Sequence, residues 1–363
     1  MKYISNPIIR YFHLQNEQYI LDLLNEEYYS VDMLENNLLF DIMSKSKNSP
    51  LTKSEIVEYI MSNYEIDKTS LNKFIEELIN AKLLLNITDF RRGWLESKEL
   101  WDLFNWKEAY VYQTFNNAKK KLDYSTSGYT SDLKYMEEYR KEKAPPSLYK
   151  DYNEKYKKIS LGEESKISNK NLSVKDVMLA EKSKKSSITF DQISYLLKMV
   201  FGIQGTRKGI LGDEYLLKTS PSGGIKHPSE CYMITTDSLK MDQLNKNTVY
   251  HYSVSSHSLM EMEVLSNIDF NKICPLIKNN SNDYSLIIII SNIFERSMYR
   301  YRESRSFKPV NIDVGHLLSS ASLVLDSLNI SYDLSHSTSF DYVNSLLKID
   351  GLKETSICYL AIK

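Results

Sequence analysis

The segment that most constrains the fold is residues 284–291, in which Leu286 to Ile290 form an unbroken aliphatic run. A strand that is apolar on both faces must be covered on both faces, so this run predicts a central strand of a sheet flanked by helices. It is too short to cross a bilayer, which takes about 20 residues. Further strands are predicted at 231–235, 248–252 and 357–362, and helices at 190–201 and 313–328. We therefore predict an α+β domain over residues 171–363.

The first 90 residues predict a small module that precedes this domain. Their apolar periodicity changes from strand-like to helical and back to strand-like. The predicted elements are a hairpin over 18–31, helices that open near Met33, Thr52 and Thr69, and a strand over 83–87. Thr52-x-x-Glu55 is a capping box. This order is a winged-helix pattern.

The charge of this module separates its alternative functions. It carries 8 Lys and Arg against 14 Asp and Glu, a net charge of −6. DNA binding needs cations that neutralise phosphates, so the charge argues against it. Two alternatives remain. The module captures an extended leader peptide, which would add a strand to the edge of the hairpin, or it is a structural packing module.

Residues 91–170 are predicted to form a helical linking region. Its first part holds all three tryptophans, Trp94, Trp101 and Trp106, and the spacing around Trp101 suits a buried helix. Ala144-Pro145-Pro146-Ser147 then interrupts the helical pattern.

The composition of the whole chain excludes several classes of protein. Lys and Arg total 46 against 47 Asp and Glu, so we expect neither nucleic acid nor a membrane surface as a partner. The three cysteines include no C-x-x-C pair, and no histidine spacing predicts a metal site. The first ten residues lack the pattern of a secretory signal, so we expect a cytoplasmic protein.

The most informative motif is Ser220-Pro221-Ser222-Gly223-Gly224, which is followed by Lys226-His227. Because glycine has no side chain, backbone N–H groups in such a loop can approach a flat ligand closely. Lys182-Ser183-Lys184-Lys185 precedes the helix that Thr189 begins, and its clustered donors suit a phosphate. Asp313-Val314-Gly315-His316 is expected to open the last long helix, whose N-terminal dipole favours an anion.

These motifs, with Tyr250-His251-Tyr252 and Gly351-Leu352-x-Glu354, resemble the SagB-type dehydrogenases. That group is a branch of the FMN-dependent nitroreductase superfamily and modifies ribosomally synthesised peptides. The resemblance is densest over residues 172–363. It implies a nitroreductase-like fold and a homodimer, because in this superfamily the FMN lies at the interface of two chains.

The resemblance also implies which residues hold the flavin. The phosphate clamp of the family falls on Lys182, Ser183 and Lys185, where lysine keeps the charge of arginine without its bidentate fork. The glycine loop would lie along the isoalloxazine, and a flavin-proximal pair would end the preceding helix. The implied FMN-binding residues are Lys182, Ser183, Lys185, Gln204, Gly205, Ser220, Pro221, Ser222, Gly223, Gly224 and His227.

One departure from the family bears on the reaction. Azoline-oxidising members carry a Lys-Tyr pair that acts in deprotonation, and residues 299–308 contain no such pair. Arginine cannot replace it as a base because its pKa exceeds about 12. Tyr301 can still donate a proton, and it is the catalytic residue that we predict.

The resulting prediction is an FMN-dependent oxidoreductase of ribosomal peptide maturation. Its substrate would be the dehydroalanine or dehydrobutyrine of a lanthipeptide-type precursor, its reductant NAD(P)H, and its partners a second copy of the chain and a peptide synthetase complex. Two alternatives stay open at this point. One is oxidation of azolines to azoles in a cyclodehydratase complex, and the other is a non-catalytic flavin-fold scaffold or leader-peptide adaptor.

Overall fold

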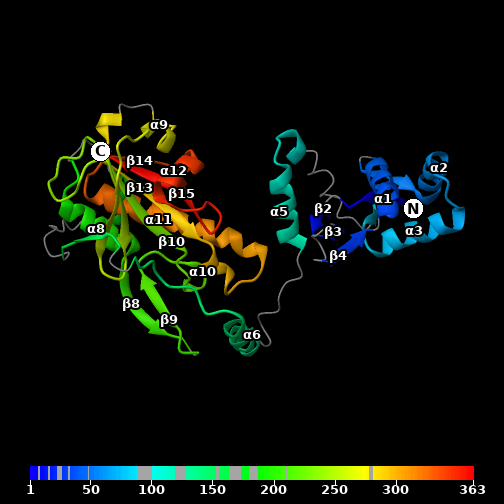
Figure 1. Cartoon of the computed structure of the whole chain (residues 1–363), viewed down its shortest axis with the longest axis horizontal. Helices are drawn as coiled ribbons and strands as arrows, with labels where there is room; N and C mark the ends of the chain where they lie inside the picture. Colours follow the sequence, from blue (N-terminus) through cyan, green and yellow to red (C-terminus); the bar gives the residue numbers. More distant parts are fainter. Residues whose placement is uncertain are drawn as a thin grey trace. The chain divides into compact units, whose positions relative to one another are not determined.

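In the computed structural model of the chain, the described residues are 1–6, 9–14, 17–22, 27–31, 33–47, 49–88, 100–118, 128–152, 155–162, 173–179, 187–209, 211–277 and 281–363. They belong to two compact units, residues 1–123 and residues 124–363 (Figure 1). Residues 91–170, the predicted linking region, are divided between the two units. Among the helices of the described ranges, none combines the length and the apolar character that crossing a membrane requires.

The first unit contains two small antiparallel sheets and several helices. One sheet has the strand order β5-β1-β6, and the other is the meander β2-β3-β4. The elements are β1 (Lys2–Ser5), β2 (Ile9–Leu14), β3 (Glu17–Asp22), β4 (Glu27–Val31), α1 (Met33–Ser46), β5 (Leu51–Thr52), α2 (Lys53–Asn63), α3 (Lys68–Asn80), β6 (Leu84–Asn86) and α5 (Lys107–Ala118). The expected hairpin, three helices and returning strand are therefore present, and the winged-helix assignment stays a prediction.

Helix caps in this unit follow local chemistry. The Thr52 side chain accepts the N–H of Glu55, and the Glu55 carboxylate accepts the N–H of Thr52, so the predicted capping box is confirmed. Helix α3 begins at Lys68, just ahead of its expected opening at Thr69. The Asp67 carboxylate caps it by accepting the N–H of Thr69, because aspartate is as strong an N-cap as threonine.

The second unit is built on one seven-stranded sheet with the order β14-β15-β13-β10-β11-β12-β7. Neighbouring strands are antiparallel throughout, so the unit is α+β. The elements are α6 (Gly128–Glu142), β7 (Lys157–Ser160), α7 (Val174–Leu179), α8 (Phe190–Phe201), β8 (Ile203–Lys208), β9 (Glu214–Lys218), β10 (Ser229–Thr235), β11 (Thr248–Ser253), β12 (Ser258–Val264), α9 (Phe270–Ile273), β13 (Leu286–Ile293), α10 (Glu295–Met298), α11 (Phe307–Ser327), β14 (Tyr332–Ser335), α12 (Phe340–Leu347) and β15 (Glu354–Ile362).

Strand β13 lies between β15 and β10 and is covered on both faces, as its aliphatic run predicts. Ile288 and Ile290 pack in a core that includes residues of α8 and α11. Ile287 and Ile289, which point the opposite way, pack in a second core with residues of α9 and α12 (Figure 1). The two cores hold the sheet rigidly, and the loops at the ends of its strands are positioned by it.

Two expectations about element ends are wrong. Helix α11 begins at Phe307, nearly two turns before Asp313, so residues 313–316 lie inside the helix and not at its N-terminus. Pro309 falls in the first turn, where a proline is tolerated because that turn has no intrahelical partner for its N–H groups. Gln204 and Gly205 do not end a helix either, since α8 ends at Phe201 and both residues lie in β8, paired with β9.

Candidate active site

The Ser220–Gly224 loop connects β9 to β10 and is attached to α11 by hydrogen bonds. Ser220 Oγ donates to Ser320 Oγ at 2.9 Å, and His316 Nδ1 donates to the Pro221 carbonyl at 3.3 Å. Ser320 and His316 both belong to α11, where they lie four residues, about one helical turn, apart. The loop is therefore held at more than one point before any ligand is considered.

A buried carboxylate, Asp313, forms the next attachment of the loop to α11. Its Oδ2 accepts a hydrogen bond from Ser222 Oγ at 2.6 Å, and its Oδ1 accepts the Gly223 N–H at 3.0 Å. Burial raises the pKa of Asp313, although these two neutral donors oppose the effect. The Gly223 N–H, which the sequence assigned to a flavin, is thus bound within the chain.

Ser222 is also the acceptor of the His227 backbone N–H, at 2.9 Å. The side chain of Ser222 therefore joins Asp313 on one side to backbone on the other, without an imidazole between them. A Ser–His–Asp arrangement needs that imidazole as the base. This geometry makes Ser222 a loop-closing residue and not a nucleophile.

The two glycines of the loop differ in what surrounds them. Gly224 has a φ of +60°, and a Cβ added to it would lie 1.9 Å from the Tyr301 hydroxyl oxygen. A Cβ added to Gly223 would lie 3.4 Å from the Pro309 Cβ, an ordinary contact. Only Gly224 is required by its surroundings, both for its left-handed backbone and for the approach of Tyr301.

Tyr301 belongs to the segment between α10 and α11, and its hydroxyl lies against the glycine loop. Tyr301 in this segment lies against Gly224, and Pro309 in the first turn of α11 lies near Gly223. Between them lies Arg305, whose Nε and Nη2 are buried and have no hydrogen-bond partner among the described residues. A buried guanidinium with unused donors is suited to an anionic group.

Two basic side chains near the loop, His227 and Lys218, have lowered pKa values. Burial, together with the nearby Lys218 ammonium, lowers the pKa of His227 to about 4, so its imidazole is neutral near neutral pH. Burial lowers the pKa of Lys218 to about 8, although the Glu230 carboxylate acts in the opposite direction. Pro221, Ser222, His227 and Lys218 line one small cavity together with Asp313.

Sequence reasoning missed a buried ion-pair group directly below the loop. Glu230 Oε1 lies 2.6 Å from Arg296 Nη2, and Glu230 Oε2 lies 2.8 Å from His251 Nε2. Arg296 also donates from Nε to the Ser147 carbonyl (2.9 Å) and from Nη1 to the His227 carbonyl (3.2 Å). Burial would raise the pKa of Glu230, but Arg296 and His251 outweigh it and hold that pKa well below its usual range. The sequence signal that could have found this group is a charged residue, Glu230, near the start of the fully buried strand β10.

A third buried carboxylate, Glu354, lies on β15, which β13 separates from β10. It pairs with Lys150 and accepts hydrogen bonds from Tyr232 (3.0 Å) and Ser291 (2.7 Å). Burial and the Glu354 charge raise the pKa of Tyr232. The resemblance included Glu354 as a motif residue, and the structure pairs it with Lys150.

The remaining predicted residues have different outcomes. Lys182, Ser183 and Lys185 lie outside the described residues. Gln204 is exposed on β8, and the register of β8 against β9 shifts between Ile203 and Gly205.

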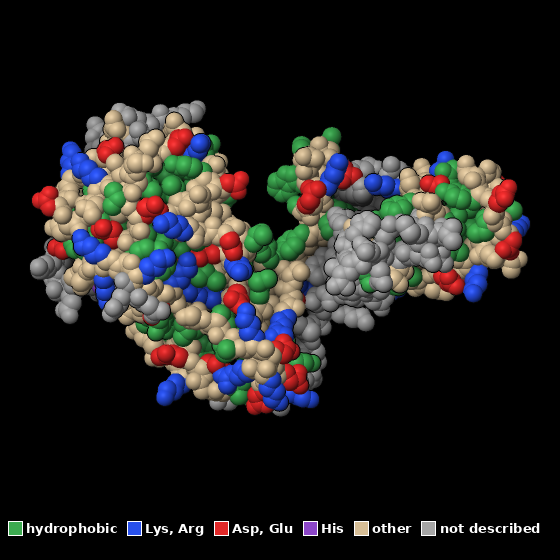
Figure 2. Space-filling view, viewed as in Figure 1, with side chains coloured by type: hydrophobic (Ala, Val, Ile, Leu, Met, Phe, Trp, Pro, Cys, Tyr) green, Lys and Arg blue, Asp and Glu red, His purple; other side chains and the backbone are tan. Residues whose placement is uncertain are grey.

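Within the described ranges, no group of three or more His, Cys, Asp or Glu side chains could hold a metal ion. Acidic and basic side chains both occur on the visible face of each unit (Figure 2).

Comparison with known proteins gives one significant sequence relative. Over 177 residues the chain is 29% identical to the trifolitoxin-processing protein TfxB of Rhizobium leguminosarum bv. trifolii. The resemblance predicted from the motifs is confirmed. The chain resembles SagB-type, nitroreductase-like proteins. The match covers 47% of this chain and 46% of TfxB, so the chain spans about half of that relative's length.

Solved structures and family models complete the comparison. A candidate nitroreductase from Anabaena variabilis has a TM-score of 0.45 and 22% identity, over 67% of this chain and 42% of that chain. A chain of the McbBCD microcin synthetase complex of E. coli, with truncated pro-MccB17 bound, has a TM-score of 0.40 and 16% identity, over 67% of this chain and 97% of that chain. No family model matches the chain.

Proposed function

We propose that the chain is an FMN-dependent oxidoreductase that modifies a ribosomally synthesised peptide, and that it reduces dehydroalanine or dehydrobutyrine with NAD(P)H. The relative named above processes trifolitoxin, which supports a peptide substrate. The observation that carries the choice of site is the approach of the Tyr301 hydroxyl to Gly224, which puts a proton donor on the glycine loop.

The donors around the loop fit a flavin. Arg305 has buried, unpartnered guanidinium nitrogens among the described residues, and Lys218 and Ser222 line the adjoining cavity. Anionic groups of FMN would pair with Arg305 and Lys218, and we propose Lys182, Ser183 and Lys185 as the phosphate contacts. When bound, FMN supplies hydride chemistry. We further propose that two chains associate, so that each flavin contacts both.

The residues of the chain supply the proton. Reduction adds one hydride, which derives from NAD(P)H, to the β-carbon of the alkene and one proton to the α-carbon. Dehydroalanine thereby becomes alanine, and NAD(P)H becomes NAD(P)⁺. Tyr301 donates the proton from its hydroxyl, and its position against Gly224 fixes where that proton is held.

The preference for reduction over azoline oxidation rests on the absence of a Lys-Tyr pair from residues 299–308. Oxidation needs a base. Of the two basic side chains that line the loop cavity, Lys218 has a pKa of about 8, whereas that of His227 is lowered to about 4. A base is most effective when its pKa is near the working pH, so this imidazole is a weak proton acceptor at neutral pH. Arg300 and Arg302, on either side of Tyr301, cannot accept a proton.

For the first unit we propose capture of a leader peptide. Its meander β2-β3-β4 has two edge strands, and a peptide can add to such an edge. Removing residues 1–123 should raise the KM for a full precursor and leave turnover of a leaderless peptide unchanged, because remote binding is lost without a change in the chemistry. An unchanged KM for the full precursor would return this unit to a packing role.

Mass spectrometry of the peptide product tests the proposed reaction. The purified protein, loaded with FMN and supplied with NAD(P)H, should add the mass of two hydrogen atoms per dehydroalanine to a dehydrated precursor. The same precursor without NAD(P)H is the control. Loss of two hydrogen atoms from an azoline peptide, without any gain on the dehydrated peptide, would establish the oxidase instead. A preparation that binds no FMN and changes neither peptide would establish a scaffold.

A further inference from the structure

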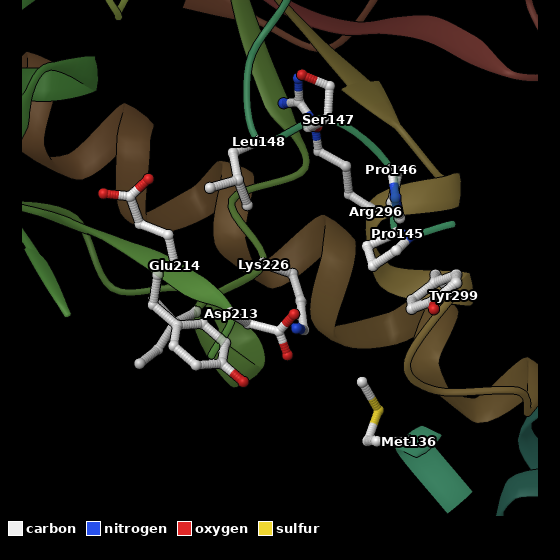
Figure 3. Close-up of a pocket in the computed structure, with 12 residues that line it drawn as sticks. Met136, Pro145, Pro146, Ser147, Leu148, Asp213, Glu214, Lys226, Arg296 and Tyr299 are labelled. Atoms are coloured by element: carbon white, nitrogen blue, oxygen red, sulfur yellow. The ribbon is translucent and has the colours of Figure 1, made fainter. Parts of the chain in front are cut away.

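A cavity of about 190 Å³ adjoins the residues that follow the glycine loop, Ile225 and Lys226. Its walls come from α6, the segment 145–148, the start of β9, the end of the loop and α10 (Figure 3). The wall residues that are apolar or aromatic are Met136, Pro145, Pro146, Leu148, Tyr215, Ile225 and Tyr299. Cavities that bind ligands combine such walls with a few placed polar groups.

The walls of this cavity are fixed by partly buried hydrogen bonds. Arg296 donates to the Ser147 carbonyl and to the His227 carbonyl, so one guanidinium holds two opposite wall segments. Tyr299 Oη donates to the Lys143 carbonyl at 3.0 Å. Arg140 pairs with Asp213 and donates to the Leu211 carbonyl at 2.9 Å, which ties α6 to the start of β9. The cavity is therefore preorganised and not a gap between mobile loops.

A cation lies inside this largely apolar space. Lys226 Nζ lies 5.1 Å from the centre of the Tyr215 ring. Burial, together with the charge of Arg300, lowers the pKa of Lys226, although the Asp213 carboxylate, which pairs with Arg140, acts in the opposite direction. An ammonium that is partly withdrawn from water attracts the electron-rich face of an aromatic ring.

The position of the cavity connects it to the proposed reaction. Ile225 and Lys226 follow Gly224 directly in the chain, and Tyr299 precedes Tyr301 by two residues. A peptide whose reacting residue lies at Gly224 and Tyr301 would therefore place a neighbouring side chain at this opening. The volume is somewhat larger than the roughly 150 Å³ cavity that accepts benzene in a well-studied host, so a phenyl or phenol ring fits.

We propose that this cavity binds an aromatic side chain of the peptide substrate, next to the residue that is modified. The proposal rests on the proposed function for naming the guest as a substrate side chain. The cavity selects the guest by its apolar walls, by its size and by Lys226. Arg296 acts as a positioning residue, because its hydrogen bonds hold the two wall segments in place.

Direct binding of small probes tests the cavity in the full-length protein. Saturation-transfer NMR should detect N-acetyl-phenylalanine amide at least about tenfold tighter than N-acetyl-alanine amide, since burying a large apolar side chain contributes more than one factor of ten. Leu148→Trp fills the cavity and should remove this preference. Leu334→Trp, on the exposed edge strand β14, is the matched control and should keep it.

A second variant keeps the test decisive if Leu148→Trp fails to fold. Lys226→Met preserves length and removes the cation, so it should weaken the phenylalanine probe roughly 2- to 30-fold and leave N-acetyl-cyclohexylalanine amide nearly unchanged. Equal binding of the phenylalanine and alanine probes to the wild-type protein would overturn the proposal. Equal losses of affinity for the phenylalanine and cyclohexylalanine probes in Lys226→Met would also overturn it.

Turnover separates this proposal from the proposed function. Precursors with phenylalanine beside dehydroalanine should have a higher kcat/KM than those with alanine, and Leu148→Trp should abolish the difference while FMN stays bound. An unchanged difference in Leu148→Trp would overturn the assignment of the guest. A protein without flavin or turnover that still prefers the phenylalanine probe would overturn the proposed function and support the cavity as an aromatic site.

Discussion

Two buried carboxylates support the same loop in opposite ways. Glu230 lies next to the loop and contacts the Arg296 guanidinium and the His251 imidazole, which hold its pKa far below the usual range. Asp313 lies beside the loop and accepts hydrogen bonds from the neutral donors Ser222 and Gly223. Burial raises its pKa, although these donors and the nearby His316 act in the opposite direction. Glu230 is thus a permanent charge in the foundation of the site, whereas the charge of Asp313 depends on pH.

The difference teaches which contacts can change during a reaction. A paired buried charge is costly to disturb, so the Glu230 group keeps the strands and the loop ends in place. The Asp313 contact joins the loop to α11 through a carboxylate whose charged form is disfavoured. We expect the foundation to decide stability and the Asp313 side to decide how the loop responds to its surroundings.

Removing the partner of Glu230 should have the largest effect on stability. Arg296→Met leaves a buried carboxylate without its main counter-charge, so the free energy of unfolding should fall by about 3–5 kcal/mol. Urea unfolding measures this. Arg302→Met, which breaks the exposed pair with Glu142, is the control and should cost less than about 1 kcal/mol. Equal losses in the two variants would contradict the distinction between foundation and surface.

Adding a methyl group to each loop glycine should have the next largest effect. Gly224→Ala introduces a Cβ at a φ of +60° and against the Tyr301 hydroxyl, so unfolding should become about 1–3 kcal/mol easier. Gly223→Ala meets only an ordinary contact and should cost less than about 1 kcal/mol. Tyr301→Ala in the Gly224→Ala background should recover part of the loss. Two equally tolerated alanines would show that Tyr301 does not occupy this position.

The smallest effect is a pair of opposite pH dependences. The raised pKa of Asp313 means that its contribution to stability is present below its ordinary pKa and is lost as pH rises through the folded value. The lowered pKa of Glu230 means that its contribution is present above its ordinary pKa and is lost as pH falls. Relative to Asp313→Asn, the wild type should therefore lose stability as pH rises, and relative to Glu230→Gln it should lose stability as pH falls. Urea unfolding between acid and neutral pH gives both slopes, and slopes of the same sign would contradict the assignment.

Features set by local sequence were predictable. The aliphatic run of β13 needs cover on both faces wherever it lies, and Thr52 and Thr189 cap their helices through side chains only three residues away. The start of α11 was predicted too late, since the helix begins at Phe307 with Pro309 in its first turn, where a proline is tolerated. Local rules predict the interiors of helices and strands and the helix caps well. They fail where an unfavourable residue is tolerated because of its position, as Pro309 is in the first turn of α11.

Features set by contacts between distant residues were not predictable. Nothing near Glu230 in the sequence points to Arg296 or His251, and only the antiparallel pairing of β10 with β11 and β13 brings them together. The meeting of Gly224 with Tyr301 also depends on the fold. The resemblance identified both residues, but it assigned the glycine loop to a flavin without the contacts that Asp313 and Tyr301 make with it.

The central claim is that Tyr301, on the glycine loop, donates the proton in the reduction of the peptide. Stopped-flow measurement of the two half-reactions of the FMN-loaded protein tests it most directly, with Tyr342→Phe, on α12, as the control. Tyr301→Phe should keep the wild-type rate of flavin reduction by NAD(P)H and should slow flavin reoxidation by a dehydrated peptide roughly 10²- to 10⁴-fold. An unchanged rate of reoxidation in Tyr301→Phe, with flavin fully bound, would contradict the account.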